Sequence, residues 1–180
     1  MKAEEIKKEE KTEHEFSKRT TQLIALTALF LAVCATFSSL KAGGFSSKAI
    51  LAQNQASNGW AYYQAKSLKE NTYKVQVDQM KINPTLDAEQ KSALMEKYQQ
   101  TVERYAAEEK EISDQAKTAE ASRDKFLALY ASFAGALTYL QIAILLASLA
   151  ALVKQIYFWY ISLGVGAVGV YFFVSTMLQV

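Results

Sequence analysis

Uncharged, mainly apolar stretches alternate with charged stretches along the chain. Residues 20–40, 126–153 and 155–180 contain no charged side chain, and these stretches are 21, 28 and 26 residues long. A helix needs about 20 apolar residues, each rising about 1.5 Å, to cross a hydrocarbon core of roughly 30 Å. We therefore expect three transmembrane helices, over residues 21–41, 126–153 and 156–180.

The clearest repeat lies in the second half of the chain, where steps of three and four residues alternate. It comprises Met95, Tyr98, Val102, Tyr105, Glu109, Ile112, Ala116, Ala119, Arg123, Phe126, Tyr130, Phe133, Leu137, Leu140 and Ile144, which we call the seam. Thirteen of these fifteen positions are apolar or aromatic. A sustained 3.5-residue repeat is typical of a left-handed coiled coil. Because the seam enters the second span without a change of phase, we expect one unbroken helix from about Leu86 to Val153.

The first arm of the charged region has a weaker pattern. Gly43 and Gly44 predict that the first helix breaks or loosens where it leaves the membrane, since glycine costs about 1 kcal/mol relative to alanine in a helix. Residues 46–82 favour a second helical segment. Its expected core stripe comprises Ile50, Ala61, Leu68, Val75 and Ile82.

Pro84 separates this arm from the seam helix. Proline disfavours a helical conformation at Asn83, so we expect a turn near residues 83–85, with Thr85 or Asp87 capping the next helix. Two helices of similar length joined by a short turn pack antiparallel. Residues 42–125 are therefore expected to form an antiparallel coiled-coil hairpin outside the membrane, reaching about 60 Å from it at about 1.5 Å per residue. The predicted fold is all-α.

The charges elsewhere narrow the classes of protein. The net charge is +2, and residues 1–20 carry six basic and six acidic side chains, which is typical of a solvated charged tail. The sequence has no basic patch of the kind that indicates binding to nucleic acid. The first apolar run is longer than the roughly 7 to 15 residues of a signal peptide, so we expect a retained anchor. Cys34, the one cysteine, lies in that span and is expected to be a packing residue.

Small residues recur in the second and third spans. Residues 164–169 read GVGAVG, which matches a dinucleotide-binding fingerprint by letter. That motif requires a preceding strand and an acidic residue about 20 positions later, and neither is indicated here. Small residues in an apolar helix instead allow close approach of another helix. The residues expected to pack helices in the membrane are Ser162, Gly166, Gly169, Gly135, Ala143 and Ala147.

No residue pattern indicates catalysis. His14 lies in the charged tail without converging ligands, and the carboxylates of residues 87–124 are expected to form a solvated helical face. The three predicted spans contain no Asp, Glu, Lys, Arg or His. Ion and proton pathways usually contain such residues, so a pump or coupled transporter is disfavoured. We expect no enzyme activity, no cofactor, no metal and no small-molecule substrate.

Aromatic and amide residues gather after the first span, in the octet WAYYQAKS from Trp60 to Ser67. This octet, between one upstream span and two downstream spans, resembles a bacterial membrane family described only as a domain of unknown function. The resemblance implies a bacterial membrane protein and no activity.

The octet has two readings. In the first, Trp60, Tyr63 and Ser67 pack against the other arm around Ala106, Ala107 and Lys110. In the second, it forms a docking surface, because exposed aromatic residues are favoured at interfaces. The candidate interaction surface comprises Trp60, Tyr62, Tyr63, Lys66 and Lys69.

The charges predict the membrane orientation, and the weak heptad pattern of residues 46–82 predicts further partners. Basic residues are dense before the first span, and Lys154 lies on the same side of the membrane. The positive-inside rule then places the N-terminus in the cytoplasm and the hairpin on the opposite side of a bacterial plasma (inner) membrane. We expect a structural or interaction protein that self-associates or serves as an accessory subunit among other membrane-protein subunits and lipid. The alternative is a small homo-oligomeric channel or transport component.

Overall fold

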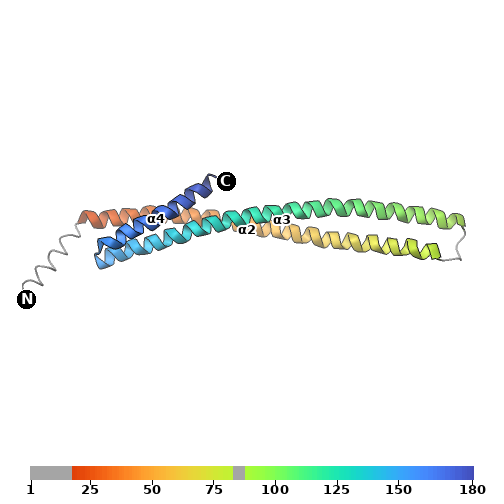
Figure 1. Ribbon diagram of the computed structural model, residues 1–180, viewed down its shortest axis with the longest axis horizontal. Coiled ribbons are helices and arrows are strands. Elements are labelled where there is room, and N and C mark those ends of the chain that lie inside the picture. The colour runs from red at the N-terminus through yellow and green to blue at the C-terminus, as the bar shows by residue number, and fades with distance from the viewer. Residues whose placement is uncertain (1–17, 83–87) are drawn as a thin grey trace, which may run out of the picture. The chain divides into compact units, whose positions relative to one another are not determined.

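Helix-favouring sequence without an internal proline produces two very long helices and a shorter third. The computed structural model describes residues 18–82 and 88–180. In this part of the chain, which is all-α, helix α2 spans Lys18–Ile82, α3 spans Ala88–Val153 and α4 spans Ile156–Met177 (Figure 1). Each helix contains a stretch long and apolar enough to cross a membrane. The predicted turn near 83–85, its caps Thr85 and Asp87, and His14 with the tail to residue 17 lie outside the described residues.

Helix α2 is continuous where the sequence predicted a break. Gly43 and Gly44 lie inside it, so the predicted break is wrong. Their neighbours Ala42 and Phe45 are only 5% and 7% exposed and pack around Phe133 of α3. Because most helical stability in proteins comes from tertiary packing, these contacts outweigh a helix-propensity cost of about 1 kcal/mol per glycine.

Helix α3 has the continuity that the seam predicted, since it runs through residues 123–130 without interruption. It ends abruptly. Lys154 has φ 54°, a left-handed conformation that stops the helix, and the Gln155 amide donates to the Ala150 carbonyl at 3.3 Å. Helix α4 begins one residue later, so α3 and α4 are joined by only two residues.

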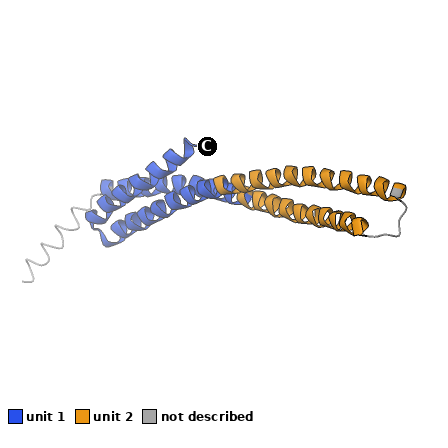
Figure 2. Ribbon diagram, turned by 45° about the vertical axis from the view of Figure 1, so that its right-hand side comes forward, with its two compact units in different colours: residues 1–47, 126–180 blue, residues 48–125 orange. Residues whose placement is uncertain are grey.

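The chain divides into two compact units (Figure 2). Unit 1 comprises residues 1–47 and 126–180, and unit 2 comprises residues 48–125. In unit 1, α2 and α3 pack together with α4. Phe45 stacks on Phe126 with ring centroids 6.3 Å apart, the Ser38 hydroxyl donates to the Phe133 carbonyl at 2.8 Å, and Leu31 packs with Leu140. In these contacts, the residue number on α3 rises as the residue number on α2 falls.

The seam changes phase inside unit 1, contrary to the prediction. The seam positions Phe133 and Leu140 are completely buried as predicted, but the seam position Tyr130 is 40% exposed. Ala136 and Ala143, which lie outside the seam, are completely buried in place of the neighbouring seam positions Leu137 and Ile144. The buried face of α3 has turned because it must meet α4 as well as α2: the Ser162 hydroxyl of α4 donates to the Ala143 carbonyl at 2.7 Å. A single seam suits one partner helix, and a third helix requires a different face.

Candidate functional site

The face of α2 that meets α3 in unit 2 consists of small and polar residues rather than large apolar ones. Steps of three and four residues run through Ala49, Ala52, Ala56, Gly59, Tyr63, Lys66, Glu70, Tyr73 and Val77, all of them buried or partly buried. We call this row the inner stripe. The predicted core stripe is wrong, because Ile50, Leu68, Val75 and Ile82 are 61%, 70%, 54% and 82% exposed.

Small residues at one end of the inner stripe bring the two helices close together. Ala56 is 1% exposed, as is Ala116 of α3. A Cβ atom placed on Gly59 would lie 3.0 Å from the Ala116 Cβ. This close approach positions the indole of Trp60 beside α3, where its Nε1 donates to Glu120 Oε1 at 2.9 Å. Tyr63 packs edge-on against the same indole, with ring centroids 5.7 Å apart.

Lys66 forms the next contact between the helices. Its ammonium group pairs with the Glu108 carboxylate and lies 5.3 Å from the Tyr62 ring centroid and 5.1 Å from that of Tyr105. Hydrogen bonding to Glu108 raises the pKa of Lys66, and the same bond lowers the pKa of Glu108. Both shifts favour the charged pair, and the two rings add a cation–π attraction.

One turn further on, two carboxyl groups meet inside the interface. Glu70 of α2 and Glu109 of α3 are only 7% and 8% exposed. Lys74 Nζ pairs with Glu70 Oε1 at 2.8 Å, while Oε1 of Glu109 is buried without a hydrogen-bond partner among the described residues. Burial is the main cause that raises the pKa of Glu109, and the neighbouring Glu70 raises it further; Tyr63 and Lys74 oppose the rise.

Three tyrosines close the site beyond the carboxyl pair. The Tyr73 ring of α2 lies 5.4 Å from the Tyr98 ring and 5.9 Å from the Tyr105 ring, measured between centroids. Aromatic pairs at this separation add attraction beyond simple burial. The polar residues of the inner stripe thus lie between a tight alanine–glycine contact and an aromatic cluster.

The structure divides the predicted interaction surface. Trp60, Tyr63 and Lys66 contact α3, whereas Tyr62 is 53% exposed and Lys69 is exposed. The predicted packing partners of the octet are wrong: Ala106, Ala107 and Lys110 are exposed. The contacts with the octet are made instead by Glu108, Glu109 and Glu120.

The carboxyl pair was not predicted. The acidic residues of 87–124 were expected to be solvated, and Glu109 contradicts this. A signal was present, because Glu109 is one of only two charged residues in the seam. Glu70 had no such signal, because the predicted core stripe of α2 runs along another face of that helix.

Five of the six small residues expected to pack helices lie at the meeting point of the three helices in unit 1. Ser162, Gly166 and Gly169 are buried, as are Ala143 and Ala147. A Cβ atom on Gly166 would be 3.0 Å from Leu31 Cδ2 of α2, and one on Gly169 would be 3.0 Å from Leu140 Cγ of α3. Gly135 does not share this arrangement, because no atom lies within 4 Å of its Cβ position.

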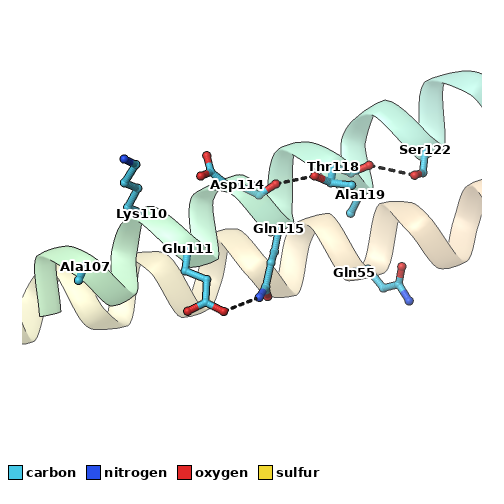
Figure 3. Close-up of a pocket in the computed structure, with 9 residues that line it drawn as sticks. All are labelled: Gln55, Ala107, Lys110, Glu111, Asp114, Gln115, Thr118, Ala119 and Ser122. Atoms are coloured by element: carbon cyan, nitrogen blue, oxygen red, sulfur yellow. Dashed lines mark hydrogen bonds between the residues drawn. The ribbon is translucent and has the colours of Figure 1, made fainter. Parts of the chain in front are cut away.

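A separate groove of about 650 Å³ in unit 2 is lined by Gln55 of α2 and by four turns of α3 (Figure 3). Its polar side chains bond within their own helix: Gln115 donates to Glu111 Oε1 at 3.2 Å, and Thr118 donates to the Asp114 carbonyl at 2.8 Å. These groups do not converge on one point in the groove. Among residues 18–82 and 88–180, no three potential metal ligands are grouped to hold an ion.

A family model described as "Domain of unknown function (DUF4337)" matches residues 20–179. The match covers all three helices. No curated protein and no solved structure matches the chain.

Proposed function

The chain belongs to the family described as a domain of unknown function (DUF4337), and we propose that it is a non-catalytic, membrane-anchored interaction protein that self-associates through unit 2. The main support for this proposal is an exposed row of residues at seven-residue intervals on α2, which includes Leu68 and Val75. Three further features support the environment in which the row would act: the apolar spans, the distribution of charge and the helix pair.

The apolar composition of unit 1 supports membrane anchoring. All three helices contain segments of sufficient length and hydropathy, and Lys41, Lys125 and Lys154 mark the ends of the uncharged stretches. The bundle buries small residues together with a few large ones such as Leu31, Phe133 and Leu140, while Leu26, Leu145 and others remain exposed. Lipid would cover that apolar surface. We place unit 1 in a bacterial inner membrane, with the N-terminus in the cytoplasm and unit 2 on the opposite side.

The contacts of unit 2 support an antiparallel coiled-coil hairpin. Trp60 pairs with Glu120, Lys66 with Glu108 and Tyr73 with Tyr98, so the partner's number falls as the number along α2 rises. The inner stripe has a 3.5-residue period, as the facing seam does.

The heptad row lies on the face of α2 that does not contact α3. Ala61, Leu68, Val75 and Ile82 follow one another at seven-residue intervals, and we call them the outer stripe. Among residues 48–82 and 89–125, every large apolar residue that is strongly exposed belongs to α2: Ile50, Leu51, Tyr62, Leu68, Val75 and Ile82. A row with this period fits a second helix wound in a left-handed coil.

A second copy of the chain is the partner that best fits the outer stripe. Two copies in one membrane carry α2 in the same direction, so Leu68 meets Leu68 and Val75 meets Val75. Lys74 and Lys81 lie one residue before Val75 and Ile82, and each is paired with an acidic residue of α2, Glu70 and Asp78 respectively.

Disulfide trapping in membranes tests the proposal. In a Cys34→Ala background, Leu68→Cys and Val75→Cys are each expected to form covalent dimers on mild oxidation. The matched control is Lys69→Cys, which lies about 100° around the helix from Leu68 and is expected to remain monomeric. Equal cross-linking at Leu68 and Lys69, or no cross-linking at either stripe position, would reject the outer stripe as the interface. A larger closed ring that conducts ions in liposomes would favour a channel instead.

A further inference from the structure

Glu70 and Glu109 form an unusual contact for a coiled-coil interface. Core positions of a coiled coil are normally apolar, yet here an acidic side chain from each helix is more than nine-tenths buried. The Glu109 Oε1 atom has no partner among the described residues. A buried, unpaired oxygen is costly when its carboxyl group is charged and much less so when the group is neutral.

The charges around this pair point to one bound proton. From α2, the groups that face Glu109 are Tyr63, Glu70 and Lys74, and Lys74 is the only cation among them. Lys66 is paired with Glu108. Two ionised carboxylates against one ammonium group leave a net charge of −1 inside the interface, and one added proton makes the set neutral.

We infer that Glu70 and Glu109 form a proton-binding site that couples the packing of unit 2 to pH. With one proton bound, the Glu109 carboxyl group donates a hydrogen bond to the Glu70 carboxylate and joins the two helices. When the proton leaves to solvent, two carboxylates face each other with one shared cation, and their repulsion loosens the helix pair. Burial and the charge of Glu70 both hold the pKa of Glu109 above its ordinary value, which is the direction this requires.

The inference does not depend on self-association, because Glu70 and Glu109 belong to the inner face of one hairpin and not to the outer stripe. Loosening is expected to be local. On the N-terminal side of Glu70 along α2, Trp60 remains bonded to Glu120. On its C-terminal side, Tyr73 remains in contact with Tyr98 and Tyr105.

A distance measurement across the helix pair tests the inference. Spin labels are placed at the exposed positions Asn71 of α2 and Ala107 of α3, in a Cys34→Ala background. The full chain is reconstituted in lipid nanodiscs with an excess of unlabelled protein, which removes distances between copies. Between pH 5 and pH 8 the distance distribution is expected to lengthen and broaden. This range stays above the lowered pKa of Glu108, so its pair with Lys66 persists throughout.

Two substitutions and a control decide the outcome. Glu109→Gln and Glu70→Gln are each expected to abolish the pH response and to keep the short, narrow distribution at pH 8. Glu103→Gln changes an exposed acid on the same helix and is expected to leave the response intact. The inference is overturned if the parent protein shows no change with pH, if both glutamine variants still respond, or if Glu103→Gln removes the response. Helix content measured by circular dichroism confirms that each variant is folded.

Discussion

Gly59 of α2 lies directly against Ala116 of α3, so that a Cβ atom on the glycine would stand 3.0 Å from the alanine Cβ. This contact sets the separation of the helices in unit 2. Bulkier residues follow it along α2, beginning with Trp60, Tyr63 and Lys66, and their polar ends reach across to α3. The close contact and the polar contacts are therefore parts of one arrangement, and changing either should alter the other.

Gly59→Leu is expected to lower the stability of unit 2 by about 1–3 kcal/mol, the usual range for overpacking a close contact. Thermal unfolding of the purified chain, followed by circular dichroism, measures this. Gly44→Ala is the control, since no atom lies within 4 Å of that Cβ position. It should raise stability, by up to about 1 kcal/mol. Equal effects at the two glycines would show that the Ala116 contact is unimportant.

Trp60→Phe is expected to cost about 1 kcal/mol, because it removes the indole donor to Glu120 while keeping most of the ring contact with Tyr63. Trp60→Ala should cost more, since the aromatic contact is lost as well. The exposed neighbour Tyr62 provides the comparison: Tyr62→Phe should change the unfolding temperature little. A neutral Trp60→Ala variant would mean that the octet does not hold the helices together.

The carboxyl group of Glu109 should make unit 2 less stable as the pH rises. Its pKa is raised in the folded chain, so the folded state binds more protons than the unfolded state between the ordinary value and the raised one. Stability from this group is full below the ordinary pKa of the carboxyl and falls as the pH passes through the raised value. Glu109→Gln should therefore unfold at a higher temperature than the parent at pH 8. The advantage should shrink toward pH 4.

Glu108 should act in the opposite direction. Its pKa is lowered by Lys66, so its contribution is present above its ordinary pKa and is lost as the pH falls through the lowered value. In the Glu109→Gln background, which removes the competing effect, acidification from pH 6 to pH 3 should lower the unfolding temperature. Adding Glu108→Gln should remove most of that dependence. If the double variant loses as much stability on acidification, another carboxyl group is responsible.

The three glycines of α4 should rank in their response to alanine. Gly169→Ala should be the most destabilising, because its Cβ would meet the backbone nitrogen of Leu140 at 3.1 Å as well as the side chain. Gly166→Ala should cost less, since it meets the movable end of Leu31. Gly164→Ala should not destabilise and, like Gly44→Ala, should raise stability by up to about 1 kcal/mol, because no atom lies within 4 Å of its Cβ position. Unfolding temperatures in detergent measure the order, and overpacking sets the scale at about 1–3 kcal/mol.

The sequence predicted the helices of this chain better than it predicted which faces they bury. Continuity of α3 followed from a repeat of large residues, such as Tyr98 and Ile112, whose size makes the 3.5-residue period visible. On α2 the same method selected Leu68 and Val75, which are exposed. The face that meets α3 is formed mainly by alanine, glycine, tyrosine and charged residues, and a hydrophobicity pattern gives these little weight.

The candidate site was predicted only in part, for a related reason. Trp60 and Lys66 were identified as notable residues, but their partners Glu120 and Glu108 depend on the rotation of α2 about its axis. That rotation is decided where Gly59 meets Ala116. The buried contact between Glu70 and Glu109 depends on it too, since each acid alone has the composition of a solvated helical position.

By itself the sequence determined that the described chain is helical, where its apolar segments lie and which family it belongs to. These properties depend on local composition and on periods along one helix. Tertiary structure alone decided which of two heptad rows on α2 faces α3, that the helix passes through Gly43 and Gly44, and that two acids share one interface. Each of these depends on how closely two helices can approach, and that distance is set by the shapes of residues far apart in the chain.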